Sequence, residues 1–189
     1  MIGITFLFLL LNSFITMQQQ ESINPKIILA DFTLPETRAL WSVVNDDVMG
    51  GVSTSKILVS ENNTLLFSGD VSLDNNGGFA SLRSPIKDYN FSNYDGFLVK
   101  VKGDGKTYSM SFRQTKYFTG YNFNLRFETE KDQWQIIKLP FADFKLKYYG
   151  REVSDYKPPD KSEIKQLSVL ISDKQEGSFR LEIEWIKLL

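Results

Sequence analysis

The stretch YNFNLRFE, residues Tyr121–Glu128, shows the pattern on which the fold prediction depends. Its apolar and polar side chains alternate one by one: Tyr121, Phe123, Leu125 and Phe127 against Asn122, Asn124, Arg126 and Glu128. A period of two residues is typical of a β-strand with one buried face and one exposed face. We therefore predict a half-buried strand here.

Similar strand-like segments recur along the chain at intervals of roughly ten residues, with turn-forming residues between them. They are Ile27–Phe32, Leu65–Val71, Gly78–Arg83, Phe97–Lys102, Tyr108–Arg113, Trp134–Leu139, Leu167–Ile171 and Phe179–Trp185. Many short alternating segments predict an all-β fold, an antiparallel β-sandwich or barrel. No long segment has a helical period, and we expect at most a short helical turn at Lys161–Lys165.

Composition excludes several classes of function. The 189 residues carry a formal charge of −1 and no basic stripe, so we do not expect nucleic-acid binding. The chain has no His and no Cys, which excludes His general bases, thiol nucleophiles, disulfides and the usual zinc motifs. Any catalysis would therefore have to rely on carboxylates, Tyr, Lys or Ser, and we predict no cofactor or metal. A carboxylate-based hydrolase is the enzymatic alternative.

The N-terminus begins with an apolar run, Ile2–Met17, whose length suits the hydrophobic region of a signal peptide. We predict a signal peptide over residues 1–20, with a membrane anchor as the alternative, a linker over 21–25 and one domain over 26–189. The run lacks the Arg-rich composition of a mitochondrial transit peptide. The predicted location is therefore outside the cytoplasm or in the cell envelope, periplasmic or membrane-associated, with membrane contact only through the N-terminal segment.

The loop WSVVNDDVMGGVS, Trp41–Ser53, combines turn-forming and apolar residues in an order that suits neither a helix nor a strand. Gly50 and Gly51 accept a positive φ, and Asn and Asp side chains fix turns by bonding nearby backbone. The loop is interpreted either as a buried structural turn or as a recognition loop. In the second case its binding residues would be Asn45, Asp46, Asp47 and Met49, with Trp41, Gly50 and Gly51 as structural residues.

Other turns also carry carboxylates and glycines. Asp74 and the pair Asp104-Gly105 could join the first loop's carboxylates around calcium, but the spacing matches no calcium loop, and capping of the turns is favoured. The Gly77-Gly78-Phe79 segment lacks the phosphate-loop pattern, so a tight structural turn is expected. Trp134 and Trp185 are predicted to lie in the core with Trp41.

Two predicted neighbouring strands carry a polar row of Ser, Asn and Arg. If Phe112 and Phe123 point inward, one face collects the polar residues Ser109, Ser111, Arg113, Asn122, Asn124 and Arg126. The face is either an ordinary hydrated surface or a ligand-binding surface. Four tyrosines suit stacking on sugars if they are exposed: Tyr117, Tyr121, Tyr148 and Tyr149.

Several motifs occur together in a distinctive order. They are NDDVMGGVS at Asn45–Ser53, FSGDVSLDNNGGFAS at Phe67–Ser81, KGDGKTY at Lys102–Tyr108, WQIIKLPFADF at Trp134–Phe144 and DKQEGSFRLEIEWI at Asp173–Ile186. This combination resembles the complex I intermediate-associated protein family over nearly all of Ala30–Leu189. The resemblance implies a jelly roll of the galactose-binding-domain-like type, the architecture of many carbohydrate-binding modules.

The resemblance also implies a function. Mitochondrial members of that family are assembly factors for NADH:ubiquinone oxidoreductase, hold membrane-arm intermediates and are not known as enzymes. Our first hypothesis is therefore a non-enzymatic, chaperone-like binding or assembly protein with a protein partner, a respiratory-complex intermediate. A carbohydrate-binding module of the cell envelope is the alternative.

Overall fold

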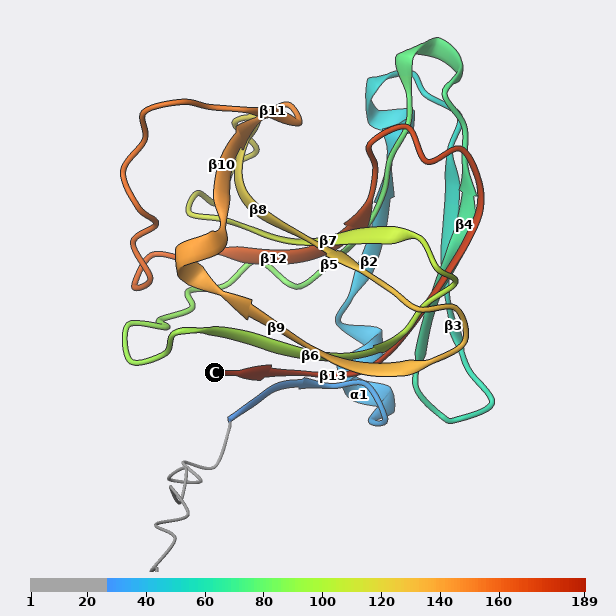
Figure 1. The fold of residues 1–189 in the computed structure, drawn as a ribbon, viewed down its shortest axis with the longest axis horizontal. Helices are drawn as coiled ribbons and strands as arrows, with labels where there is room; N and C mark the ends of the chain where they lie inside the picture. Colours follow the sequence, from blue (N-terminus) through green and yellow to red (C-terminus); the bar gives the residue numbers. More distant parts are fainter. Residues whose placement is uncertain (1–26) are drawn as a thin grey trace, which may run out of the picture.

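The computed structural model describes residues 27–189, which form two antiparallel β-sheets packed face to face (Figure 1). The predicted signal peptide and linker lie outside the described residues. The first sheet contains β1 (Ile28–Asp31), β3 (Thr54–Val59), β4 (Leu65–Val71), β6 (Gly96–Lys102), β9 (Trp134–Pro140) and β13 (Gly177–Leu188). The second contains β2 (Ser42–Asn45), β5 (Ala80–Arg83), β7 (Thr107–Arg113), β8 (Tyr121–Glu128), β10 (Lys145–Tyr148), β11 (Arg151–Glu152) and β12 (Gln166–Ile171).

The strand order is that of a jelly roll. The first sheet runs β3-β4-β13-β6-β9, with β1 also paired to β13, and the second runs β11-β10-β8-β7-β12-β5-β2. The prediction of an all-β antiparallel sandwich is confirmed. The strands β2, β3, β10 and β11 were not anticipated, because they are short or lack a clear alternation.

Helical structure is confined to short turns in the described residues. They are α1 (Pro35–Ala39), η1 (Asp46–Met49), η2 (Asp74–Asn76) and η3 (Phe141–Asp143). The prediction of a helical turn at Lys161–Lys165 is wrong. The Glu163 N–H closes a tight turn on the Asp160 carbonyl at 3.1 Å, and Ile164 then forms a β-bridge with Tyr89. Between residues 27 and 189, no helix is long and apolar enough to cross a membrane.

The core lies between the sheets and is rich in phenylalanine. Phe97 of the first sheet meets Phe141 edge to face, with ring centroids 4.9 Å apart, and Phe112 of the second meets Phe144 at 5.0 Å. Offset and edge-on aromatic pairs add to the burial of apolar area. Trp41 belongs to the same core, as predicted, and packs edge-on against Phe32.

Two of the three tryptophans predicted in the core lie outside it. A β-bulge in β13 between Ile183 and Trp185 adds one residue to the strand, so the inward positions shift from Ile183 to Ile186 and Trp185 faces outward. Trp134 pairs with Lys102 on the outer face of the first sheet. The Nζ of Lys102 lies 5.2 Å from its ring centroid.

Glu182 is a buried carboxylate on the outer side of β13. It accepts hydrogen bonds from Ser60 Oγ at 2.6 Å, Thr64 Oγ1 at 2.8 Å and Asn62 Nδ2 at 2.9 Å, and it pairs with Lys102 Nζ at 2.8 Å. Burial alone would raise its pKa, but these donors outweigh that effect and lower the pKa from 4.5 to about 2. The loop between β3 and β4 is thereby fixed to β13.

We expect Glu182→Gln to lower the free energy of unfolding by about 2–3 kcal/mol at pH 7. Because the folded-state pKa lies below the ordinary value of 4.5, the carboxylate's contribution is complete above about pH 4.5 and disappears as the pH falls toward 2. Urea unfolding measured from pH 7 to pH 2.5 should therefore show a smaller acid-induced loss of stability in the variant than in the wild type.

Glu184→Gln is the matched control, because Glu184 sits on the same strand but forms a more exposed pair with Lys100. It should cost less than about 1 kcal/mol. Equal effects of the two substitutions would contradict the assigned role of Glu182.

Candidate functional site

The loop that opens the second sheet is organised around the carboxylate of Asp46. Asp46 is 1% exposed. Its Oδ1 accepts the Ser53 N–H at 2.9 Å, and its Oδ2 accepts the Ser53 hydroxyl at 2.6 Å and the backbone N–H groups of Gly78 at 2.5 Å and Phe79 at 3.2 Å. Burial opposes ionisation, but these donors prevail and lower the pKa of the Asp46 carboxyl.

The glycines of both motifs make room for this carboxylate. A Cβ at Gly51 or Gly77 would lie less than 3.0 Å from side-chain atoms of Asp46. Gly78 has a φ of +129° and donates to Asp46 from that conformation. Gly50 has a φ of +88° and ends η1. The VMGG and NGGF motifs, separate in sequence, therefore form one structural unit.

The Asp46 carboxylate is therefore used for hydrogen bonds within the protein, and its burial keeps it from contact with a ligand. The neighbouring candidates differ. Asn45 is half-buried and accepts the Ser55 hydroxyl at 2.5 Å, whereas Asp47 and Met49 are exposed. The structural turn is thus centred on Asp46, whereas the recognition role remains a prediction for the exposed residues Asp47 and Met49.

The other predicted turn carboxylates serve separate turns. Asp104 accepts the Tyr108 hydroxyl at 3.0 Å and the Arg180 N–H at 2.9 Å, which ties the Asp104-Gly105 turn to β13. Asp74 is exposed at the start of η2. Within the described range, three acidic side chains that could share a metal ion are not found together.

The outer face of the second sheet brings together the predicted polar row. Ser109 lies opposite Arg126, and Ser111 lies opposite Asn124, which confirms that the two strands share this face. Lys145 and Lys147 of β10 continue it on one side, opposite Asn124 and Asn122. On the other side the face continues across β12 and β5, where Ser168 lies between Ser111 and Arg83.

The centre of this face is buried although it is polar. Ser109, Ser111 and Asn124 are 3%, 4% and 5% exposed. In Figure 1 the ends of the curved sheet, β10 and β11 on one side and β2 with η1 on the other, stand on either side of β7 and β12. Asn124 Oδ1 and Arg113 Nε are buried and lack a hydrogen-bond partner among residues 27–189. Such atoms are unusual in folded proteins and call for a specific explanation, of which a bound water, ion or ligand is one.

Sequence reasoning did not place Arg83 in this site. Its alternation with Ser81 was visible, but only the pairing of β5 with β12 puts it beside the predicted row. Burial lowers the pKa of Arg83, and the positive charge of Arg113 lowers it further. The two arginines lie on strands that flank β12 on either side, with Arg83 opposite Ser168 and Arg113 opposite Gln166. Arg126, in contrast, is exposed and pairs with Asp173 at 3.4 Å.

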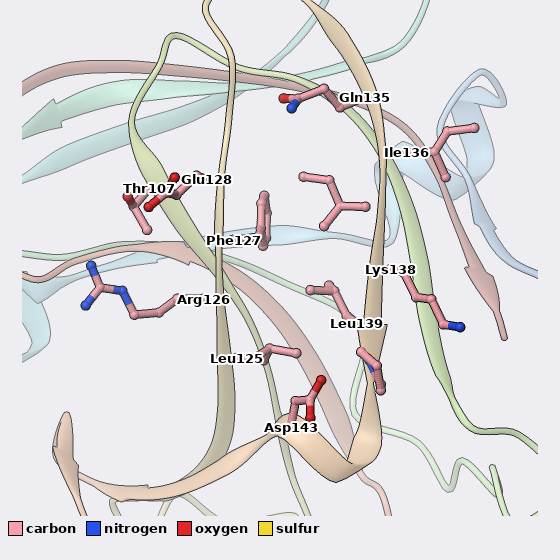
Figure 2. A pocket seen from close by; sticks show the side chains of 12 residues that line it. Thr107, Leu125, Arg126, Phe127, Glu128, Gln135, Ile136, Lys138, Leu139 and Asp143 are labelled. Atoms are coloured by element: carbon pink, nitrogen blue, oxygen red, sulfur yellow. The ribbon is translucent and has the colours of Figure 1, made fainter.

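A separate cleft of about 730 Å³ opens between β8 and β9, at one side of the sandwich. Figure 2 shows Leu125, Phe127 and Leu139 between the two strands, whereas Arg126 and Glu128 point to the other side of β8. The alternation of β8 therefore points its apolar side chains toward β9 and its polar side chains toward the outer face.

Exposed apolar groups flank the polar face. Val48 and Met49 of η1 are 67% and 60% exposed. At the opposite end of the sheet, ring contacts link a cluster of exposed aromatic residues, Phe118, Tyr121, Tyr148 and Tyr149. Tyr117 is exposed as well. The tyrosines predicted as accessible are thus at the surface.

The fold defines a class, the galactose-binding-like jelly rolls that include carbohydrate-binding modules. The chain is similar to the family 11 carbohydrate-binding module of the cellulosomal cellulase Lic26A-Cel5E of Clostridium thermocellum, with a TM-score of 0.62 and 17% identity over 87% of this chain and 94% of that one. The family 11 module from the same organism in complex with a β-1,3-1,4-mixed-linked tetrasaccharide gives a TM-score of 0.59 at 18% identity, over 86% of this chain and 94% of that one. At these identities the likeness shows the fold alone.

The family model for complex I intermediate-associated protein 30 matches residues 30–183. The chain belongs to this family, as the sequence motifs indicated. It is 28% identical to complex I intermediate-associated protein 30, mitochondrial, of Drosophila melanogaster over 85% of this chain and 62% of that protein. The corresponding protein of Mus musculus is 27% identical over 89% of this chain and 57% of the relative. The match thus spans little more than half of each relative.

The predicted localisation is contradicted by these relatives. The proteins from Drosophila melanogaster, Mus musculus and Caenorhabditis elegans are all named as mitochondrial, which points to mitochondria and not to export or the cell envelope. The relatives are named for association with an intermediate of complex I and not for a reaction. The sequence argument failed because it relied on one apolar N-terminal run.

We expect Gly51→Ala to lower the free energy of unfolding by about 2 kcal/mol or more, because the new methyl group would overlap the Asp46 carboxylate. The φ of Gly51 is not in the left-handed region, so the cost is steric. In an Asp46→Ala background the same substitution should cost less, because the carboxylate atoms nearest to the new methyl group are gone and only the Cβ of residue 46, at 2.9 Å, remains in close contact. Chemical denaturation of the two single variants and the double variant would measure this coupling.

Gly150→Ala is the control for a glycine substitution. Gly150 has a φ of +77° and open space around its Cβ position, so only backbone strain of about 1 kcal/mol is expected, independent of Asp46. Additive effects of Gly51→Ala and Asp46→Ala would show that the two residues do not form the unit described.

Proposed function

We propose that this protein is a non-enzymatic assembly factor that binds a protein partner, an intermediate of respiratory complex I. Family membership supports the class of partner. The surface we propose for the contact is the outer face of the second sheet together with the exposed side of η1.

We choose this surface because two polar atoms near its centre are buried and make no hydrogen bond within the described chain. Asn124 Oδ1 and Arg113 Nε are buried without a hydrogen-bond partner in the described chain. A buried polar atom without a partner costs roughly 1–3 kcal/mol. A bound partner that supplies the missing hydrogen bonds would remove that cost, which a purely hydrated surface has no need to incur.

The exposed residues of η1 supply an apolar contact beside this polar centre. Val48 and Met49 are mostly exposed although they follow directly from β2, the edge strand of the sheet. The buried carboxylate of Asp46, two residues before Val48, fixes the backbone that presents them. Protein interfaces commonly combine such apolar anchors with polar groups, and methionine is enriched in them.

The test uses the full tagged chain in its native cells. Complexes from mitochondrial extracts would be separated by native electrophoresis and probed for complex I subunits. The wild type should migrate with a complex I intermediate, and Met49→Ser should weaken that association about tenfold without changing the melting temperature. Ile136→Ser is the matched control, because Ile136 is 61% exposed but lies on β9 of the first sheet.

Two outcomes would contradict the proposal. The wild-type chain migrating alone in cells that assemble complex I would remove the partner. Binding of the purified chain to mixed-linked glucan oligosaccharides, lost on substitution of Asn124 and accompanied by no association with complex I subunits, would favour the carbohydrate-binding alternative.

A further inference from the structure

Arg83 and Arg113 are two half-buried arginines on the outer face of the second sheet, on the two strands that flank β12, where Arg83 lies opposite Ser168 and Arg113 opposite Gln166. Arg83 Nε donates to Ser81 Oγ at 3.0 Å. Neither guanidinium group forms an ion pair with a carboxylate in the described part of the chain. Their charges therefore repel each other without compensation.

Other arginines of the protein are placed differently. Arg38 is buried but donates to the carbonyl oxygens of Phe32 at 2.6 Å and Asn63 at 2.9 Å. Arg180 pairs with Asp132 at the surface. The protein thus satisfies these guanidinium groups with oxygen, whereas the Arg83–Arg113 pair keeps donors available.

The surroundings of the pair identify the complementary ligand. Arg126 is already paired with Asp173. Lys145 and Lys147 add positive charge on the neighbouring strand, and Glu152 of β11 lies opposite Lys147. Guanidinium groups bind carboxylates through two parallel hydrogen bonds, most strongly where water is partly excluded. Asn124 Oδ1 needs a donor instead, such as a backbone N–H.

We propose that Arg83 and Arg113 bind a carboxylate side chain of an acidic segment of the protein partner, while Asn124 accepts a backbone N–H of the same segment. This inference rests on the proposed function and names the chemistry that its surface recognises. An acidic peptide carries both the acceptor for the arginines and the donor for Asn124. Inorganic phosphate in its dianionic form carries acceptors and a single hydroxyl donor but no backbone N–H.

The direct test measures binding of acetylated hexaglutamate amide to the full chain by calorimetry, with hexaglutamine amide and inorganic phosphate as comparisons. We expect hexaglutamate to bind, hexaglutamine not to bind, and phosphate to bind more weakly than hexaglutamate. Arg83→Gln and Arg113→Gln should each weaken hexaglutamate binding about tenfold. Arg180→Gln, which removes the same charge from the first sheet, should leave binding within about twofold.

A second measurement separates ligand binding from a structural role. Removal of either arginine relieves their mutual repulsion, so the melting temperature of Arg83→Gln and of Arg113→Gln without peptide should equal or exceed that of the wild type. A clear fall in melting temperature in both variants would assign the pair to the support of the fold and overturn the proposal.

The remaining outcomes distinguish this inference from the proposed function. If hexaglutamate does not bind, binds equally to all variants, or binds no better than phosphate, the acidic-peptide site is overturned, even where the chain still associates with complex I subunits. If hexaglutamate binding depends on both arginines but no association with complex I subunits is found, the site stands and the proposed partner is wrong.

Discussion

The buried carboxylate of Asp46 is the constraint on which the arrangement of this sandwich depends. Two connections cross between the sheets at the same end: the one from β2 to β3 through η1, and the one from β4 to β5 through η2. Asp46 belongs to the first and accepts N–H groups of Gly78 and Phe79 in the second. One side chain thereby fixes both crossings, and glycines are needed where the two segments approach it.

Buried polar groups have two different roles in this protein. Asp46 and Glu182 each accept several hydrogen bonds, and the donors keep the pKa of both carboxyls low, as expected for groups that stabilise the folded state. Arg83, Arg113 and Asn124 instead have unused hydrogen-bonding capacity on one sheet face. The contrast between satisfied and unsatisfied groups distinguishes the scaffold from the candidate site more clearly than residue type does.

The jelly roll explains how one fold serves different ligands. Its interior is a Phe-rich core. The chemistry of the outer face of the second sheet is set by side chains that point away from this core and can therefore differ between proteins that share the fold. The family 11 carbohydrate-binding module shares the fold at 17% identity. In this chain the same architecture carries a cationic face, with η1 beside it. The flanking loops depend on the Asp46 contacts for their position.

Much of the fold could be predicted from sequence, since period-two alternation reflects the local geometry of a strand. β8 was predicted with its observed bounds, Tyr121–Glu128. The assignment of Trp185 to the core failed, because a single inserted residue at the bulge reverses the alternation. The short β10 and β11 were missed because they depend on pairing with β8 and with each other.

Only part of the candidate site could be predicted from the sequence in the same way. Adjacent strands joined by a hairpin placed Arg113 and Asn124 on one face. Arg83 could be added only once β12 was known to lie between β7 and β5. The β12–β5 pairing joins residues more than 80 positions apart, which alternation does not encode. The sequence by itself determined the long alternating strands, most of their inward faces and the glycine motifs, because these follow from local geometry. Only the tertiary structure decided that the VMGG and NGGF motifs enclose Asp46. It alone also placed Arg83 and Arg113 on one face without a carboxylate partner in the described chain, because burial and long-range strand pairing set those contacts.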